Sequence, residues 1–386
     1  MYNVYQHWDP LKVCVVGKSY PPEFYSWITK PAVRSLFEKI AIETEEDYQV
    51  IIKKLKSFGV EVLRPNLPAN SFVNGQFVMP PMTPRDDTVM IGETFYSKFN
   101  WHEASFEGFY NNVKDTSWPE CDSIEKFYHL PKHIRDECIQ VHNMHKFLAR
   151  HKNINGNNSN VYQDIFDHVT SIGNRFVEGA DLIINGAMVT RIGRDLYFGT
   201  KNYVEDPFRI IQAVEKEFPD NRTHVVNTGG HSDGTYCPVC PGLIISLYDV
   251  PTYADTFPDW EVVYLPAQGF DAFEDFMDLK AKNKGKWWIP GFEKNQDVID
   301  TVETWLGHWT GYVEETVFDV NMLIIDPKNV MVFNYNKQVF DALEKYGITP
   351  HIVPFRHRYF WDGGIHCVTT DLHREGGMQD YFPQRG

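Results

Sequence analysis

The clearest pattern of apolar and polar positions lies in the last fifth of the chain. MLIID (322–326) and VMVFN (330–334) are apolar runs separated by a Pro-Lys-Asn turn, which predicts two strands joined by a hairpin. NKQVFDALEKY (336–346) has apolar residues at helical spacing and is followed by Gly347, a residue typical of helix ends. ITPHIVPF (348–355) is again apolar. The segment therefore predicts the order strand, strand, helix, strand.

The same order recurs elsewhere in weaker form. We expect helices over 45–58 and 204–218, and strands over 11–17, 60–65, 86–96, 182–186, 188–193, 195–199, 223–228 and 242–249. Residues 98–175 are rich in aromatic, Asn and His residues and fit this pattern least, so we expect helices and loops there. Recurring mixed units favour an α/β protein built from structural repeats. Because no Gly/Ser-rich or Pro-rich linker interrupts the chain, we expect a single domain over 1–386.

Composition narrows the class of protein. The 386 residues are 42% hydrophobic and 15% aromatic, which is enough for a substantial core. A formal net charge of −15 disfavours binding to nucleic acid and is compatible with a cationic small substrate. No apolar run approaches the roughly 18 residues of a membrane helix, so no membrane partner is expected. The opening residues lack the basic and apolar regions of a secretory signal, and six cysteines are too few for a disulfide scaffold. We therefore expect a cytoplasmic protein with reduced thiols.

Four short segments place reactive side chains beside predicted turns, where binding groups commonly lie. The segments are TPRDD (83–87), VEGAD (177–181), GGHSDGT (229–235) and GGIHC (363–367). Their reactive residues are Asp86, Asp181, His231, Asp233, His366 and Cys367. A thiolate that attacks, an imidazole that moves a proton and a carboxylate that fixes the imidazole tautomer form a nucleophilic set. Further carboxylates can hold a planar cation through paired hydrogen bonds.

Each of these residues also has a plain structural interpretation. Cys367 alone is more typical of a buried structural thiol, and His231 alone of a hydrogen-bonded or surface histidine. Asp181 at a turn is typical of a cap. Spacing alone therefore leaves the chemistry open.

A zinc site is an alternative for the CxxC segment. Cys237 and Cys240 lie close in sequence to His231, and Cys367 or His366 would complete a tetrahedral set. A structural zinc site usually shows a second closely spaced pair of ligands, and none is evident. We therefore expect no metal.

The order of these motifs resembles the amidinotransferase family. The resemblance rests on GAD, then HSD, then GGIHCVTTDLHREGGMQDYF near the C-terminus, with PRDDTVMIGETF, NVYQHWDPLKVCVVG and VNMLIIDPKNVMVFN as further similar segments. It implies a pentein fold, an α/β-propeller of five ββαβ-type modules around a pseudo-fivefold axis. It also implies a homodimer.

The resemblance assigns roles to single residues. Cys367 matches the nucleophile, His231 the acid–base residue and Asp181 its orienting carboxylate, while Asp86 and Asp233 match the positions that hold the guanidinium. His366 is then not the base. The implied reaction moves the amidino group of L-arginine through a covalent amidino-cysteine to an amine acceptor and releases ornithine. No cofactor is required.

Two departures from the glycine-using enzyme of the family concern the acceptor. Gly230 replaces a methionine before the catalytic histidine, and Glu314 and Glu315 replace a serine pair. We expect an acceptor other than glycine. Unless the two glutamates are merely solvated, they favour a cationic acceptor such as lysine or a diamine, or a different mode of holding arginine. The alternatives are a hydrolase of the same superfamily, which yields citrulline and ammonia, and a non-catalytic binding protein on a pentein scaffold.

Overall fold

In the computed structural model, the strands of the described residues form five three-stranded sheets and one small hairpin. The structure describes residues 1–73, 76–97, 114–121, 129–140, 161–178, 186–200, 215–228, 231–247, 253–265, 289, 291–292, 294–306, 309 and 319–386. The sheets are β17 (Thr369–Arg374), β1 (Leu11–Val16), β2 (Glu61–Leu63); β5 (Thr88–Ile91), β6 (Thr94–Ser97), β7 (Arg175–Glu178); β8 (Val189–Ile192), β9 (Asp195–Thr200), β10 (Arg222–Asn227); β11 (Tyr236–Cys240), β12 (Leu243–Ser246), β13 (Glu261–Tyr264); and β14 (Leu323–Asp326), β15 (Asn329–Val332), β16 (Thr349–Ile352).

All five sheets follow one pattern of pairing. In each, the first strand is antiparallel to the second, and the second is parallel to the third. A short turn suffices for the antiparallel pair, whereas the parallel pair requires a longer crossover. The five predicted modules of the α/β-propeller are therefore confirmed.

The module of β14, β15 and β16 shows how the sequence produces this pattern. Its crossover is α12 (Lys337–Lys345), which begins after Asn336, whose side chain accepts hydrogen bonds from the backbone N–H groups of Gln338 and Val339. The helix is followed by Gly347 with a φ of 69°, a left-handed conformation that suits glycine. The predicted order of strand, strand, helix, strand is confirmed here.

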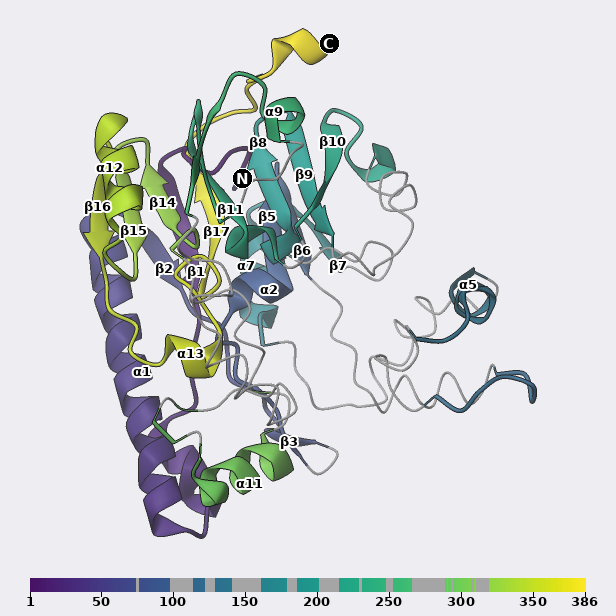
Figure 1. Cartoon of the computed structure of the whole chain (residues 1–386), viewed down its shortest axis with the longest axis vertical. Coiled ribbons are helices and arrows are strands. Elements are labelled where there is room, and N and C mark those ends of the chain that lie inside the picture. Colours follow the sequence, from purple (N-terminus) through teal and green to yellow (C-terminus); the bar gives the residue numbers. More distant parts are fainter. Residues whose placement is uncertain are drawn as a thin grey trace.

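Helix α1 (Pro31–Ser57) is the crossover between β1 and β2 and forms the long column in Figure 1. Its buried residues recur at helical spacing, from Val33 and Phe37 to Leu55. The helix begins with a proline at its first position and is followed by Gly59, whose φ is 76°. The helix is thus longer than the predicted 45–58.

The remaining elements are short, and one predicted strand was wrong in detail. The expected strand over 86–96 is a helical turn, α2 (Pro84–Asp87), followed by the β5–β6 hairpin, because Gly92 turns the chain with a φ of 55°. The other described elements are η1 (Pro22–Trp27), β3 (Phe72–Val73), β4 (Gln76–Phe77), α5 (Lys132–Gln140), α7 (Gln163–Ser171), η2 (Gly186–Met188), η3 (Ser232–Gly234), α9 (Tyr253–Thr256), α11 (Gln296–Trp305), α13 (Arg358–Trp361) and η6 (Pro383–Arg385). Most of the predicted segments 182–186 and 204–218 lies outside the described residues. No described helix has the length and apolar character needed to cross a membrane.

The two ends of the chain meet in one sheet. β17 pairs with β1 from Leu11 opposite Arg374 to Val16 opposite Thr369, so the first strand of this module comes from the far end of the sequence (Figure 1). The module of β17, β1 and β2 is therefore completed by a long-range pairing, whereas the other four begin with a local hairpin.

The first strands of the modules converge on a buried cluster of charges. Asp371 on β17 binds Arg191 on β8 through both carboxylate oxygens at 2.9 Å, Arg85 at 2.7 Å and Arg374 at 2.6 Å. All four side chains are almost completely buried. Arg374 also donates to the carbonyl of Ile324 on β14. This cluster, called the axial charge cluster below, connects the modules where their first strands meet.

Electrostatics keep Asp371 ionised. Burial alone would raise its pKa, but the guanidinium groups of Arg191, Arg85 and Arg374 together hold it well below its usual value. The cluster contains three cations and one anion, so its positive charge is in excess.

Candidate active site

The candidate site residues lie just before the first strands of their modules. Cys367 precedes β17, Asp86 precedes β5, His231 and Asp233 precede β11, and Asn321 precedes β14. Because these strands converge, their entry turns meet at one end of the axis. The repeat thus brings together side chains that are far apart in sequence.

The turn that carries the nucleophile candidate is closely packed. Gly364 has no room for a side chain, because a Cβ there would lie 2.2 Å from Oδ1 of Asn321. Upstream, Arg356 donates from its backbone N–H and its Nε to the buried carboxylate of Asp47 on α1, at 2.6 and 2.9 Å. These contacts fix the approach of the chain to Cys367, which is only 1% exposed.

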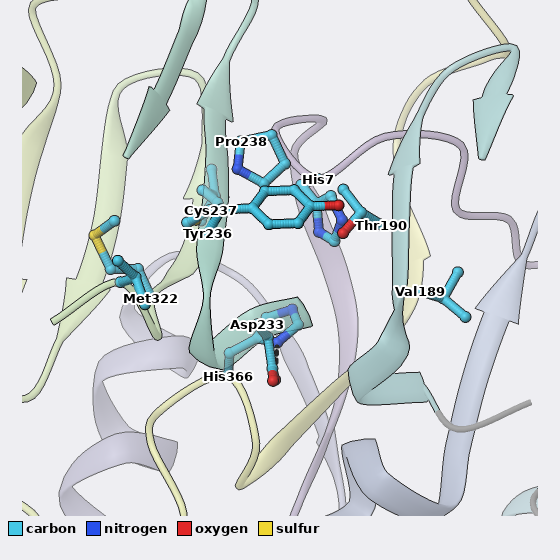
Figure 2. Close-up of a pocket in the computed structure, with 11 residues that line it drawn as sticks. His7, Val189, Thr190, Asp233, Tyr236, Cys237, Pro238, Met322 and His366 are labelled. Carbon is cyan, nitrogen blue, oxygen red and sulfur yellow. Dashed lines mark hydrogen bonds and ion pairs between the residues drawn. The ribbon is translucent and has the colours of Figure 1, made fainter. Parts of the chain in front are cut away.

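The sulfur of Cys367 lies between a donor and an acceptor. Nδ2 of Asn321 donates to Sγ at 3.0 Å, and Sγ donates to Oδ2 of Asp233 at 3.6 Å. The same oxygen of Asp233 lies 2.7 Å from Nδ1 of His366 (Figure 2). The carboxylate therefore has both a thiol and an imidazole as immediate neighbours.

His366 is a neutral partner for Asp233. Burial, followed by repulsion from Arg85 and His7, lowers the pKa of His366 well below its usual value. A neutral imidazole that faces a carboxylate through Nδ1 carries its proton on that nitrogen and donates it in the hydrogen bond. The ring of His7 lies 5.8 Å away, centroid to centroid.

His231 and Asp86 form the more open side of the site. Nδ1 of His231 lies 3.8 Å from Oδ1 of Asp86, and their side chains are 22% and 25% exposed. These fractions are well above that of Cys367, so a small cation or an amine can reach this side from solvent.

A small cavity is lined in part by Asp233 and His366 (Figure 2). Its volume of about 20 Å³ has room for a water molecule but not for an amino acid. It is lined by His7, Val189, Thr190, Asp233, Tyr236, Cys237, Pro238, Val320, Met322, Ile324 and His366.

The structure places some of the predicted residues and leaves others open. It brings Cys367 and Asp233 together, and His231 and Asp86 together. Asp181, Gly230, Glu314 and Glu315 lie outside the described residues. Asn321 was not predicted; the signal that marks it is its position before a first strand, equivalent to that of Cys367.

The two cysteines of the CxxC segment lie in one buried strand. Cys237 and Cys240 lie in β11 as buried free thiols, and burial raises the pKa of Cys240 to about 11. In the part of the chain that the structure describes, no three His, Cys, Asp or Glu side chains are grouped in a way that could hold a metal ion.

Curated proteins similar to the chain are amidinotransferases. Mitochondrial glycine amidinotransferase of Xenopus laevis is 24% identical over 413 residues, which cover 98% of this chain and 84% of the relative. Inosamine-phosphate amidinotransferase 1 of Streptomyces glaucescens is 21% identical over 414 residues and 98% of both chains. L-arginine:L-lysine amidinotransferase of Pseudomonas savastanoi pv. phaseolicola is 22% identical over 221 residues, 56% of this chain and 51% of the relative. No protein-family model matches the chain.

Solved structures show the same fold. SxtG, an amidinotransferase of the saxitoxin biosynthetic pathway from Microseira wollei, has a TM-score of 0.59 at 17% identity and 99% coverage of both chains. Inosamine-phosphate amidinotransferase StrB1 of Streptomyces griseus has a TM-score of 0.59 at 16% identity, again with 99% coverage of both.

The chain therefore has the predicted pentein fold. The relatives described above that match the chain over nearly its whole length are amidinotransferases, so the predicted resemblance to that family is confirmed.

Proposed function

We propose that the protein transfers the amidino group of L-arginine to an amine acceptor through an amidino-cysteine on Cys367 and releases ornithine. The observation that carries the proposal is the position of the Cys367 sulfur, 3.6 Å from the Asp233 carboxylate at the end of the axis. A carboxylate so close to the sulfur would place a bound guanidinium within reach of attack. The L-arginine:L-lysine and inosamine-phosphate relatives support amidino transfer.

The first half of the reaction exchanges a carbon–nitrogen bond for a carbon–sulfur bond. Asp86 and Asp233 hold the planar cation, and the Cys367 thiolate attacks its central carbon. The bond from that carbon to Nε of arginine, the nitrogen that becomes the side-chain amine of ornithine, breaks. His231 gives this nitrogen a proton, because a neutral amine leaves far more readily than an amide ion. Ornithine departs and the amidino group remains on sulfur, with Asp181 proposed to orient His231.

The second half reverses these bond changes with a different amine. The acceptor nitrogen attacks the amidino carbon while His231 removes its proton, and the carbon–sulfur bond breaks. The thiolate of Cys367 is restored, and the product is a guanidino compound. No net proton or electron is gained or lost, and no cofactor takes part.

For the acceptor, we propose a cationic amine such as lysine or a diamine. Glu314 and Glu315 provide carboxylates for a second ammonium group, and Gly230 leaves more space beside the imidazole than the methionine it replaces. Changing both glutamates to Gln should lower kcat/KM for lysine and putrescine and leave that for glycine unchanged. Equal kcat/KM values before and after the change, for every acceptor, would contradict this part of the proposal.

The decisive experiment is product analysis with arginine in the presence and absence of amines. The panel is glycine, lysine, putrescine and an amino-cyclitol, with Cys367→Ala as the inactive variant and Cys240→Ala as the matched cysteine control. Acceptor-dependent ornithine that disappears only in Cys367→Ala establishes the transferase. Citrulline and ammonia that form regardless of added amine would instead identify a hydrolase, and no adduct on Cys367 would identify a binding protein.

Two features of organisation are part of the proposal. Residues 1–386 form one catalytic domain, since β17 completes the sheet that contains β1. The protein is a homodimer, which light scattering of the purified chain would test.

A further inference from the structure

The side-chain amide of Asn321 is bound at both of its ends. Oδ1 accepts hydrogen bonds from the backbone N–H groups of His366, at 2.8 Å, and Cys367, at 3.4 Å. Nδ2 donates to the Asp233 carbonyl at 3.3 Å and to the Cys367 sulfur at 3.0 Å. These partners fix the orientation of the amide, because a flipped amide would set its oxygen against a carbonyl and its NH2 against two donors. The side chain is only 5% exposed.

This amide links three modules at the nucleophile. Asn321 precedes β14, Asp233 precedes β11 and Cys367 precedes β17. Glycine at position 364 leaves room for the Asn321 amide, because a Cβ on Gly364 would lie 2.2 Å from Oδ1 of Asn321. The side chain of Asn321 thus bonds to the backbone N–H of His366, to the backbone N–H of Cys367 and to the Cys367 sulfur.

We propose that Asn321 is a catalytic residue whose Nδ2–H group holds the Cys367 sulfur and stabilises its thiolate, while Oδ1 fixes the backbone of the nucleophile. This role rests on the proposed function of Cys367. A hydrogen bond to a charged acceptor is stronger than one to a neutral acceptor, so an N–H donor at 3.0 Å favours thiolate over thiol. Asp233 has the opposite effect, because it accepts from the thiol and repels the thiolate.

The other ionisable side chains near Cys367 are held by partners other than Asn321. His366 is neutral and bound to Asp233. Arg85 donates from its backbone N–H to the Cys367 carbonyl at 3.3 Å, and its guanidinium is bound to Asp371. His231 and Asp86 lie on the open side. A change in the ionisation of Cys367 in Asn321 variants therefore reports on the amide itself.

The test is the rate of alkylation of Cys367 by iodoacetamide as a function of pH. It uses the full chain without arginine or amine, and mass spectrometry of the Cys367 peptide separates this thiol from the other cysteines. Asn321→Ala removes the donor, and Asn321→Asp replaces it with a carboxylate oxygen of the same size. We expect the apparent pKa of Cys367 to rise by about 1 to 2 in Asn321→Ala, which slows alkylation at neutral pH by about 10- to 100-fold, and to rise further in Asn321→Asp.

Asn174 provides a matched control. It is also a buried asparagine whose amide bonds backbone from both ends, with Oδ1 accepting from Tyr2 and Nδ2 donating to the carbonyls of Tyr2 and Glu93. Asn174→Asp should lower stability without moving the alkylation pKa of Cys367. A merely structural role for Asn321 would give the same result in its own variants.

An unchanged alkylation pKa in Asn321→Ala and Asn321→Asp, with native near-ultraviolet circular dichroism, would overturn the inference. If Asn321→Ala does not fold, the isosteric Asn321→Asp decides. Failure of the proposed function is distinguishable, because iodoacetamide needs neither arginine nor an acceptor. A wild-type Cys367 that resists alkylation at every pH would count against its role as nucleophile. A reactive Cys367 that is insensitive to residue 321 counts only against this inference.

Discussion

Replacing Asp371 by Asn tests whether the axial charge cluster depends on its carboxylate. The change removes the negative charge that Arg85, Arg191 and Arg374 share and leaves three buried cations together. Breaking a buried ion pair by removal of one partner costs about 3–5 kcal/mol, because the other charge remains buried without compensation. Domains have a free energy of unfolding of only about 5–15 kcal/mol. We therefore expect Asp371→Asn to lose a large part of the stability.

The matched variant removes a cation instead. Burial, together with repulsion from Arg85 and Arg374, lowers the pKa of Arg191 to about 10 despite its contact with Asp371. Arg191→Met leaves Asp371 with two cations and relieves part of that repulsion. Its cost should be about 1–3 kcal/mol, from lost hydrogen bonds such as the one to the Met90 carbonyl.

Urea unfolding at pH 7, followed by the fluorescence of the ten tryptophans, measures both variants against the wild type. The midpoint should fall clearly further for Asp371→Asn than for Arg191→Met. Equal midpoints for the two variants, or a wild-type midpoint for Asp371→Asn, would refute the reasoning that excess positive charge governs this cluster.

Two further predictions concern stability. Burial and repulsion from Arg191 lower the pKa of His7 well below its usual 6.5, so below pH 6.5 the unfolded chain binds a proton that the folded chain does not. The free energy of unfolding should therefore decrease as pH falls. In His7→Gln, the slope of the free energy of unfolding against pH, measured between pH 6 and 5, should be smaller by about 1.4 kcal/mol per pH unit. An unchanged slope would disprove this. Gly17→Ala should lower the melting temperature, because its Cβ would lie 2.1 Å from the Met82 carbonyl oxygen. Gly377→Ala, where no atom lies within 4 Å of the added Cβ, should leave the melting temperature unchanged and serves as the control in the same thermal scan.

Sequence patterns predicted the elements whose determinants are local. The β14–α12–β16 module was predicted closely because its turn, cap and apolar periodicity all lie within about thirty residues. Helix α1 was predicted only in its second half, although Pro31 at its first position is a start signal. Gly92 explains why one predicted strand is a hairpin.

Features that depend on long-range contacts escaped prediction. TTDLHR, the sequence of β17, is polar, and its burial depends on β1 and on arginines from other modules. Asp371 therefore gave no sign of its place in the core. Asn321 gave no chemical signature either, since an asparagine before a strand is common. Only the equivalence of the five entry turns, which the folded chain reveals, distinguishes it.

The pairing of β17 with β1 also determines when the site can form during synthesis. The chain is synthesised from its N-terminus, so β1, α1 and β2 are made long before the strand that completes their sheet. Until residues 369–374 have been synthesised, β1 lacks its β17 neighbour and has an unpaired edge. The Cys367 thiol is therefore positioned only after the strands of the other four modules have been synthesised.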